Sequence, residues 1–593
     1  MKQLFKFFKP YLWQFAVLLV MMYLMVAATL ALPDYMAKII NDGIVAQDMS
    51  AVWYNGWIML AMALGAAAAS IVVGWFASRI ASGFSRDTRA AAFSKVESFS
   101  LQEFNTFSTA SLITRSTNDV QQIQTVLTML LRMALMAPFM GVWAIIKAYQ
   151  NAPSMTWIMG LAVGVLIIII AALFTAAIPK FKKLQKLVDR LNLVSREILT
   201  GLRVVRAFNR ESLEEKKFDD ANTELTQLNL FTNRLLMVMQ PVMMLIMNIT
   251  TLAVVWYGAH LVDLGNLQIG QMLAFMQYAM QAIFAFLLIT IVFIMVPRAA
   301  VSVDRIGEVL ATEATIKNPK NPIQAAPDGD GKVEFEHVTF AYAGADDPVL
   351  FDISFTALPG QTTAFVGSTG SGKSTLINLI PRFYDATKGS VKIDGIDVRD
   401  MRMEDVYSKI GFVPQKGVLF SGTVESNVKY GAANASLDDV QKAAEIAQAK
   451  EFIENLQGEY QAEIAQGGTN ISGGQKQRLS IARAIIRNPE LFIFDDSFSA
   501  LDFATDAKLR AALSHATKNK TVLIVAQRIS TIMNADKIIV LDEGRIVGQG
   551  THLQLMKSCE VYREIASSQL SEEELRRETS AHGALQIAKE GSR

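Results

Sequence analysis

Six long apolar stretches constrain the fold of this chain more than any other feature of its sequence. A helix needs about 20 mostly apolar residues to cross the hydrocarbon core of a bilayer. The third stretch is the weakest, because Pro138 interrupts it. We therefore predict six transmembrane helices in the first half of the chain, at roughly residues 14–32, 56–78, 133–150, 156–178, 240–262 and 272–296.

The amino-terminal residues alternate lysine with leucine and phenylalanine as far as Lys9, and Pro10 follows. This pattern predicts a short helix that lies in the membrane interface and ends near the proline. A secretory signal peptide is the alternative. The apolar run 15–32 is longer than the core of a signal peptide, and it ends without a small-x-small cleavage site.

Lysine and arginine are distributed unevenly between the stretches. Lys38 and Lys147 are the only two on one side. The other side carries two inserts of about 50 residues or more, the first with residues such as Arg79, Arg86, Arg89, Lys95 and Arg115 and the second with twelve lysines and arginines between Lys180 and Arg234. Positive loops stay cytoplasmic, so we expect both inserts and both termini to be cytoplasmic. Apolar spacing such as Ile123, Val126, Leu127 predicts that the membrane helices continue into the cytoplasm as hairpins, and two separate cytoplasmic subdomains are the alternative.

The second half of the chain reads as a soluble domain. Residues 313–331 are rich in proline, asparagine and glycine, which predicts a linker. From Lys332 onward strands alternate with helical segments, which is typical of an α/β fold. The predicted organisation is a transmembrane domain over 1–312, a linker over 313–331, an α/β domain over 332–570 and a charged tail over 571–593.

Composition agrees with an apolar part fused to a soluble part. The chain is 51% hydrophobic and its mean hydropathy is +0.27, which is high for a soluble protein and modest for one wholly in the membrane. A net charge of +1 provides no overall field for nucleic acid, so we expect no nucleic-acid partner. The lone Cys559 excludes a disulfide within the chain.

A glycine-rich loop indicates the chemistry of the second half. An apolar run, 363–366, precedes it and another, 376–380, follows it, so the order is strand, loop, helix. In a loop of this pattern the backbone N–H groups surround phosphates, the lysine lies between the β- and γ-phosphates and the next hydroxyl binds Mg²⁺. A chance glycine turn is the alternative, which the strand and helix disfavour. The residues predicted to bind a nucleoside triphosphate are Gly367, Ser368, Thr369, Gly370, Ser371, Gly372, Lys373, Ser374 and Thr375.

Two further motifs extend this site. The apolar run 491–494 ends in Asp495, which is placed to reach Mg²⁺, and Asp496 stands where a base or water-orienting group would act. Ser472, Gly473, Gly474 and Gln475 precede a helix predicted over 479–486, and present a second set of N–H groups to an anion. An ordinary strand end and an ordinary helix cap are the alternatives. A second anion site separate from the loop suggests that two chains share nucleotide.

With these motifs in place, the chain resembles the half-transporters of the ATP-binding cassette (ABC) exporter family from Met1 to about Gln569. In that family two cassettes meet head to tail, and each ATP lies between the phosphate loop of one chain and the signature segment of the other. The resemblance implies that Tyr342 stacks on adenine, that Gln415 binds Mg²⁺ together with Ser374 and Asp495, and that Asp502 belongs to a loop at the partner's ATP. It also implies that segments near 104–111 and 208–218 couple the membrane helices to the cassettes.

Two positions depart from the family pattern. The family places glutamate after the Mg²⁺ aspartate, and this chain has Asp496, whose side chain is one methylene shorter. The family places histidine in the switch loop, and this chain has Gln527, which can donate a hydrogen bond but carries no charge. A smaller departure is Gln466-Gly467, where the family usually has Gly-Glu. The first two departures resemble those of the degenerate-site chain in heterodimeric ABC exporters, whose partner chain carries the glutamate and the histidine.

The resemblance implies an ATP-driven exporter subunit in the cell membrane that takes a hydrophobic or amphipathic small molecule, lipid or peptide. Two alternatives remain: a slow homodimeric exporter or flippase that uses Asp496 itself, and an ATP-gated regulatory membrane protein. Methionines in the last two spans, such as Met243 and Met276, are candidates for an adaptable substrate surface, and ordinary packing or lipid contact is the alternative that we favour for most of them. The spans hold almost no ionisable residues well inside the bilayer, which argues mildly against a small, highly charged substrate.

Overall fold

The computed structural model describes residues 2–324 and 329–570, which form two compact units. The first unit comprises Met1–Glu97 and Thr109–Glu313, and the second comprises Ser98–Ser108 and the chain from Ala314 onward. The predicted boundary at residues 312–313 stays a prediction, although the two units divide close to it. The predicted tail, 571–593, lies outside the described residues.

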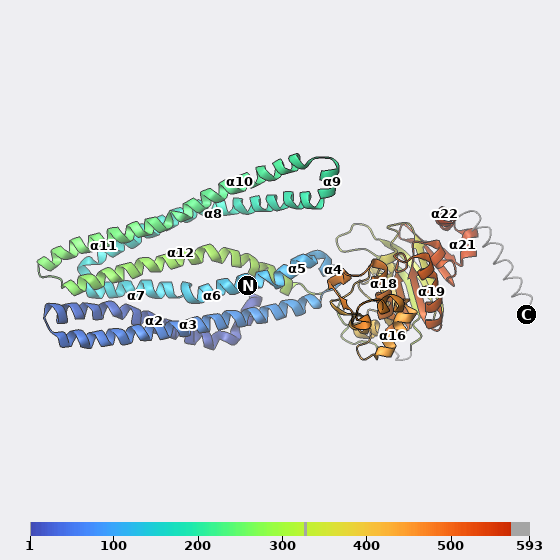
Figure 1. Cartoon of the computed structure of the whole chain (residues 1–593), viewed down its shortest axis with the longest axis horizontal. Helices are drawn as coiled ribbons and strands as arrows, with labels where there is room; N and C mark the ends of the chain where they lie inside the picture. The colour runs from blue at the N-terminus through green and yellow to red at the C-terminus, as the bar shows by residue number, and fades with distance from the viewer. Residues whose placement is uncertain (1, 325–328, 571–593) are drawn as a thin grey trace, which may run out of the picture. The chain divides into compact units, whose positions relative to one another are not determined.

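Over its described residues, the first unit has helices as its only regular secondary structure, and short turns join them. Six of its helical segments are long and apolar enough to cross a membrane, as predicted. Figure 1 shows α2, α3, α6, α7 and α12 running side by side, with α8 and α10 forming a hairpin that has α9 at its tip. The helices are α1 (Lys2–Phe8), α2 (Leu12–Lys38), α3 (Met49–Glu97), α5 (Thr109–Ser116), α6 (Asn118–Met129), α7 (Met136–Asn151), α8 (Thr156–Thr200), α9 (Leu202–Ala207), α10 (Glu211–Met237), α11 (Met239–Asp263) and α12 (Ile269–Ala311).

Several of these helices are much longer than a bilayer is thick. The helix α3 has 49 residues and α8 has 45, which at about 1.5 Å per residue is roughly twice the thickness of the hydrocarbon core. Their cytoplasmic halves continue the membrane helices without a break, so the alternative of separate cytoplasmic subdomains is wrong.

A π-helical turn joins α6 to α7. It covers Leu130–Ala134, and the Leu135 N–H donates to the Leu130 carbonyl five residues back. Pro138 lies in the first turn of α7, where its missing N–H is tolerated. The helix that contains the predicted third span is therefore continuous with α6, and Arg132, just before that span, lies in the same rod.

Polar side chains connect three of the membrane helices near their outer ends. The Lys147 ammonium of α7 lies 2.7 Å from a carboxylate oxygen of Asp34 of α2, and the Tyr278 hydroxyl of α12 donates to the same carboxylate. Tyr278 is fully buried. From the sequence we used Lys147 only as a positive charge on the outer side. Its ion pair with Asp34 could not be predicted, because the two residues are more than a hundred positions apart.

Topology is tested most directly by accessibility. In a Cys559→Ser background, Ala46→Cys and Asn266→Cys should react with an impermeant maleimide added to whole cells, because both positions are exposed and predicted to face outward. Ser212→Cys, exposed near the tip of the α8–α10 hairpin, should react only after the cells are permeabilised. Labelling of position 212 from outside would overturn the orientation.

The second unit is an α/β fold around three sheets. The central sheet has the order β12-β11-β3-β10-β9-β6, and all its neighbours run parallel except β12 and β11. An antiparallel sheet has the order β2-β1-β4-β5, and β7 pairs with β8. The strands are β1 (Val333–Phe340), β2 (Leu350–Ala357), β3 (Thr362–Gly367), β4 (Lys388–Ile393), β5 (Ile396–Asp397), β6 (Ile410–Val413), β7 (Gly422–Thr423), β8 (Glu463–Ile464), β9 (Leu491–Asp495), β10 (Thr521–Val525), β11 (Lys537–Asp542) and β12 (Arg545–Gly550).

Helices cover the central sheet. The predicted linker, 313–331, is held by hydrogen bonds to this unit at two of its residues. Asn318 accepts a hydrogen bond from the Met403 N–H, and the Ile323 N–H donates to the Asp400 carbonyl, so both residues are held on the second unit. The helices of this unit are α4 (Leu101–Phe107), α13 (Lys373–Leu379), α14 (Met403–Ser408), α15 (Val424–Lys429), α16 (Leu437–Ile446), α17 (Lys450–Glu454), α18 (Gly473–Ile486), α19 (Phe503–Ala516), α20 (Ile529–Ile532), α21 (His552–Ser558) and α22 (Glu560–Gln569).

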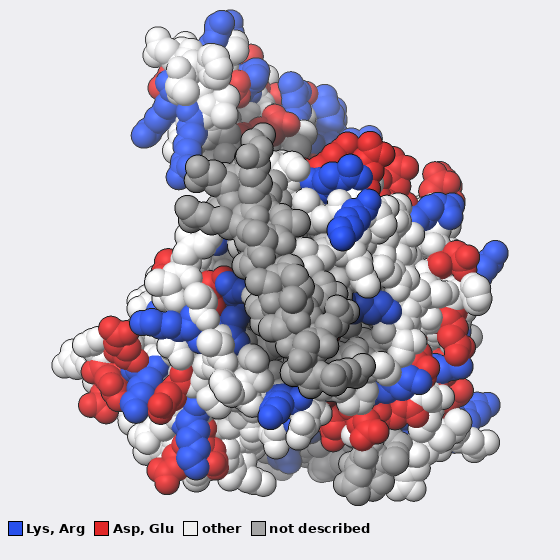
Figure 2. Space-filling view, turned by 90° about the vertical axis from the view of Figure 1, so that its right-hand side faces the viewer, with Lys and Arg blue, Asp and Glu red and all other residues white. Residues whose placement is uncertain are grey.

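Figure 2 shows charged side chains of both signs on the described part of one face of the molecule. Lysine and arginine alternate with aspartate and glutamate on that face, and no continuous basic field is seen there. The expectation that nucleic acid is not a partner stays a prediction.

Candidate functional site

The parallel strands of the central sheet bring the predicted site residues to one edge. Asp495 at the end of β9 is in register with Val525 at the end of β10, and Val525 pairs with Phe365 of β3. Because the carboxyl ends of parallel strands meet at the same edge, the glycine-rich loop after β3, Asp496 after β9 and Gln527 after β10 lie together.

The glycine-rich loop has the strand and helix context that its pattern requires. It leaves β3 at Gly367, where an added Cβ would lie 2.0 Å from the Leu541 carbonyl oxygen, so only glycine fits. Gly370 and Gly372 have φ values of +86° and +94°, in the left-handed region that favours glycine. The loop then enters α13 at Lys373, so that its N–H groups and the helix N-terminus face the same space.

Lys373 and the carboxylates of Asp495 and Asp496 place charges of both signs at the loop. The Lys373 ammonium donates to the carbonyls of Gly367 and Ser368 at 3.0 and 2.7 Å, and burial lowers its pKa against the opposing effect of the nearby carboxylates. The Ser374 hydroxyl donates to Asp495 Oδ1 at 3.0 Å. Burial raises the pKa of the Asp495 carboxyl, and the Asp496 charge adds to this. A cation beside Asp495 and phosphates beside Lys373 would satisfy both groups.

Asp496 is enclosed by two amides. Its Oδ2 atom accepts from Gln527 Nε2 at 2.9 Å and from Gln415 Nε2 at 3.3 Å. The residue is 6% exposed and has a φ of +45°, a left-handed conformation that is uncommon outside glycine and that aspartate adopts more often than most residues. The structure therefore brings together the two departures, Asp496 and Gln527, and joins both to Gln415.

The predicted adenine-stacking residue lies beside the loop. The Tyr342 hydroxyl is 2.9 Å from Thr375 Oγ1, and its ring meets the Tyr384 ring edge to face at 5.3 Å. Tyr384 in turn accepts a hydrogen bond from Asn105 of α4 at 3.2 Å. The helix α4 includes part of the segment predicted to couple the two halves of the chain.

The predicted signature segment forms a site of its own. Ser472 caps α18, its hydroxyl accepting from the Gln475 N–H while Gln475 Oε1 accepts from the Ser472 N–H. This capping box starts the helix at Gly473, six residues before the start predicted at Leu479. Asp502 likewise caps α19 through the Thr505 N–H. Among the described residues, neither Ser472–Gln475 nor Asp502 makes a hydrogen bond or ion pair with the glycine-rich loop.

Two glutamines that the sequence did not single out hold these parts in place. Gln477 of α18, 2% exposed, donates to the Pro414 carbonyl at 3.0 Å and accepts from the Gly417 N–H at 3.0 Å, so it ties the signature helix to the loop that carries Gln415. Gln569 of α22 donates to the Gln527 carbonyl and accepts from the Ile529 N–H, both at 2.8 Å. No local pattern marks either glutamine, because their partners lie 40 to 63 residues away.

The donor set fits a magnesium ion. Mg²⁺ prefers oxygen ligands, and it is held by one or two protein side chains together with substrate phosphates and water. Ser374 Oγ and Asp495 Oδ1 are adjacent oxygen donors beside the loop. Within residues 2–324 and 329–570, no cluster of three or more His, Cys, Asp or Glu side chains suits a metal ion. The phosphates themselves would therefore have to complete the coordination.

Comparison with protein families matches both halves of the chain. Residues 15–286 match the family described as the ABC transporter transmembrane region, and residues 350–499 match the family described as ABC transporter. The second family implies ATP binding by this domain.

Relatives and solved structures match nearly the whole length. An uncharacterized ABC transporter ATP-binding protein of Mycobacterium tuberculosis is 42% identical over 95% of this chain and 97% of its own. The ATP-dependent lipid A-core flippase of Pseudomonas aeruginosa is 32% identical, covering 89% and 87%, and a multidrug resistance ABC transporter ATP-binding and permease protein of Lactococcus lactis is 30% identical, covering 87% of each. The solved structure of a bacterial Atm1-family ABC exporter with ATP bound matches with a TM-score of 0.79 and 25% identity, covering 94% of this chain and 98% of that one. The chain therefore belongs to the ABC transporters, as a multi-pass membrane protein of the exporter fold with a cytoplasmic nucleotide-binding domain.

Proposed function

We propose that this chain is one half of a heterodimeric ABC exporter, that its own site holds ATP but hydrolyses it poorly, and that Ser472–Gln475 and Asp502 complete the active site of the partner. The observation that carries the proposal is the enclosure of Asp496 by Gln527 and Gln415. Hydrolysis needs a carboxylate that accepts a hydrogen bond from the attacking water.

The geometry at Asp496 opposes that role in two ways. Its Oδ2 atom already accepts two hydrogen bonds from amide donors, so a water would have to compete for it. Its carboxylate is also one methylene closer to the backbone than a glutamate would place it, and a misplacement of about 1 Å can cost roughly 100-fold in rate. Gln527 remains able to donate to a γ-phosphate, which favours holding ATP.

The free signature segment supports the second part of the proposal. Ser472 and Gly473 are exposed at the start of a 14-residue helix, where N–H groups face outward. A helix N-terminus of this kind binds phosphate oxygens. Since the described residues place no phosphate loop of this chain against it, the phosphate would come from ATP on a second chain.

The cytoplasmic hairpin of the first unit also supports an assembly of two chains. Its tip exposes large apolar side chains, with Leu199 74%, Phe208 73% and Val204 61% exposed. A cavity of about 450 Å³ lies beside the tip and is lined by residues such as Leu202 and Phe218. Apolar groups of this size at a cytoplasmic helix turn favour contact with another protein surface, and we assign it to the nucleotide-binding domain of the partner chain.

We further propose that Lys373 and the loop bind the phosphates, that Ser374, Gln415 and Asp495 hold Mg²⁺, and that Tyr342 stacks on adenine. Bound Mg²⁺ would neutralise phosphate charge during hydrolysis. Gln415 lies on Asp496 and makes no hydrogen bond to Ser374 or Asp495, so it would have to turn from Asp496 to reach the ion.

Two of the relatives reported above carry names of a lipid flippase and a multidrug exporter. These names support export of a hydrophobic or amphipathic substrate by this chain and its partner. They fit a homodimer as well as a heterodimer, so assembly has to be measured.

The experiment is to isolate the tagged full-length chain from the membranes of the cells that encode it, identify a co-purifying ABC half-transporter by mass spectrometry, and compare ATP turnover. We expect a partner that carries the glutamate and the histidine, and turnover of the chain alone about 100-fold or more below that of the pair. If the isolated chain turns over ATP as fast as the pair, it needs no partner chain and the heterodimer proposal is wrong. A slow homodimer would then also be excluded, because turnover would not be slow.

Nucleotide binding at this chain's own site has a separate test. Lys373→Ala should weaken binding of a fluorescent ATP analogue to the purified chain about tenfold or more, because a charge-assisted contact to phosphate contributes about 1.5–3 kcal/mol. Lys388→Ala, at an exposed lysine of β4, is the matched control and should leave binding unchanged. Unchanged binding in the Lys373 variant would remove the proposed role of the loop.

A further inference from the structure

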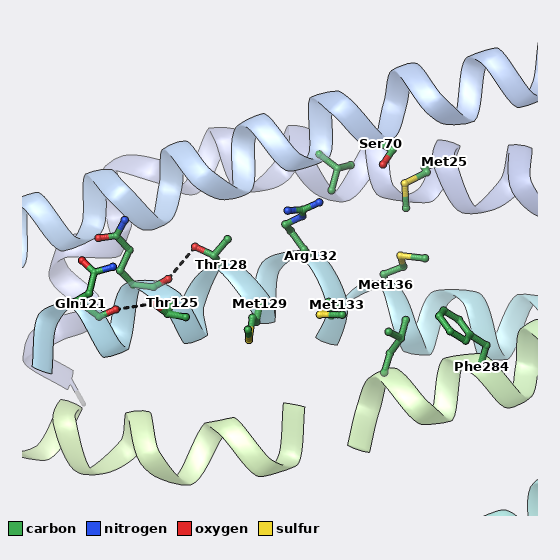
Figure 3. A pocket seen from close by; sticks show the side chains of 13 residues that line it. Met25, Ser70, Gln121, Thr125, Thr128, Met129, Arg132, Met133, Met136 and Phe284 are labelled. Carbon is green, nitrogen blue, oxygen red and sulfur yellow. Dashed lines mark hydrogen bonds between the residues drawn. The ribbon is translucent and has the colours of Figure 1, made fainter. Parts of the chain in front are cut away.

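A cavity in the membrane unit contains a cation without a counter-charge. It has a volume of about 720 Å³ and is lined by residues of α2, α3, α6, α7 and α12 together with the π-helical turn. Arg132, in that turn, is its only lining residue with a charge. Figure 3 shows the Arg132 side chain rising from the joined rod of α6 and α7 toward α3, with Ser70 and Met25 nearby.

Arg132 has no partner among the residues that the structure describes. No hydrogen bond, ion pair or ring contact is formed by its guanidinium there, and no aspartate or glutamate lines the cavity. It extends toward Gly74 of α3, where an added Cβ would lie 3.9 Å from the guanidinium carbon. An arginine remains charged in proteins, so the Arg132 guanidinium offers five N–H donors and a positive charge to a ligand in the cavity.

The position of Arg132 along the helix places it at the cytoplasmic border of the hydrocarbon. It lies 19 residues before Asn151, the outer end of α7, which is roughly 28 Å at 1.5 Å per residue. The hydrocarbon core is about 30 Å thick. The guanidinium is therefore at the depth of the headgroups of the inner leaflet.

The cavity is amphipathic along the same direction. Met25, Met136 and Phe284 lie on the outer side of Arg132, within the hydrocarbon, and Gln121 and Thr125 lie on its cytoplasmic side (Figure 3). The Gln121 side-chain amide makes no hydrogen bond to a described residue, so it can donate to a ligand. Methionines fit acyl chains or rings of varied shape.

We propose that this cavity binds an anionic amphiphile from the cytoplasmic leaflet, with its negative head on Arg132 and Gln121 and its apolar part between Met25, Met136 and Phe284. The proposal rests on the exporter function above and names its substrate class. The same cation, with no carboxylate to offset it, disfavours lipophilic cations. The methionines involved belong to the first and third spans rather than to the last two, where the sequence placed them. Arg132, at the edge of the hydrocarbon, adds a charge that the assignment of the spans did not include.

The test compares three probes of equal chain length on the purified full-length chain in phosphatidylcholine nanodiscs: dodecyl phosphate, dodecyltrimethylammonium and dodecyl maltoside. Wild-type protein should bind dodecyl phosphate about tenfold or more tightly than either of the others. Arg132→Gln should remove that preference, and Arg132→Lys should keep part of it, because the charge remains but the planar fork is lost. Arg79→Gln, at an arginine that rests on the Trp75 ring outside the cavity, should change nothing.

The source of the amphiphile is decided in a second arm, by extracting the lipids that stay bound through purification. Enrichment of phosphatidylglycerol in wild type over Arg132→Gln assigns a lipid headgroup, and no enrichment with retained dodecyl phosphate selectivity assigns a free amphiphile. Equal binding of the three probes, or unchanged selectivity in Arg132→Gln, would overturn the proposal. These measurements need neither ATP turnover nor the partner chain, so their failure leaves the heterodimer proposal standing, and the converse also holds.

Discussion

Replacing Ser472 by arginine should lower steady-state ATP turnover of the proposed heterodimer about 100-fold or more, although Ser472 lies outside this chain's own phosphate loop. The substitution places a large side chain where N–H groups at the start of α18 would hold the γ-phosphate of the partner's ATP, and loss of such donors costs about 100- to 1,000-fold. Turnover of the complex is the measurement, with assembly checked by co-purification.

The chain offers a matched control for this substitution. Ser436 is also an exposed serine that caps a helix, α16, through a capping box with Asp439. Ser436→Arg should remove a similar helix cap and lower the free energy of unfolding by about 1 kcal/mol. It should leave ATP turnover unchanged. Asp496→Asn should also change turnover little. If Asp496→Asn stops turnover while Ser472→Arg keeps it, the assignment of the two sites is reversed.

The second large effect is a gain. The double substitution Asp496→Glu with Gln527→His should raise hydrolysis at this chain's own site by about 100-fold, because the carboxylate extends by a methylene and the amide that engages it is removed. The effect is measured in a heterodimer whose partner has lost its phosphate-loop lysine, so that only this site can turn over.

Each single substitution serves as its control. Gln527→His alone removes one amide from Asp496 but leaves the carboxylate short, and Asp496→Glu alone leaves Gln527 beside it. Contacting residues act as a unit, so we expect the pair to exceed the product of the two. If the double variant shows no gain, Asp496 and Gln527 do not limit the rate of hydrolysis at this site. The departure at Gln466 is then the next position to restore.

Much of the fold could be predicted because its signals are local. Apolar length alone marks the membrane helices, and lysine and arginine counts orient them. The start of α18 was missed by six residues, because Gly473 and Gly474 read as a loop and only the reciprocal bonds of Ser472 and Gln475 reveal a helix. Arg132 was missed because a hydropathy window excludes a charge at its edge, whereas the π-helical turn continues the helix through it.

For the candidate site, the residue types could be predicted but not their mutual contacts. The glycine-rich loop, Asp495 and Ser472 each belong to a short pattern. The enclosure of Asp496 depends on which strands lie next to β9, and strand order in a sheet is set by packing of residues far apart in the sequence. Gln477 and Gln569 act through backbone groups of distant loops, so their side chains look like ordinary helix positions in the sequence.

The hydrogen bond from Asn105 to Tyr384 links the loop between the second and third spans to the base end of the nucleotide site. Tyr384 contacts Tyr342, and Tyr342 contacts Thr375 at the start of α13. A bound adenine on Tyr342 would therefore stiffen the base-side end of this connection whether or not the γ-phosphate is ever cleaved. If this site holds ATP without cleaving it, as proposed, the contact between α4 and the base-side tyrosines would persist while hydrolysis proceeds at the opposite site.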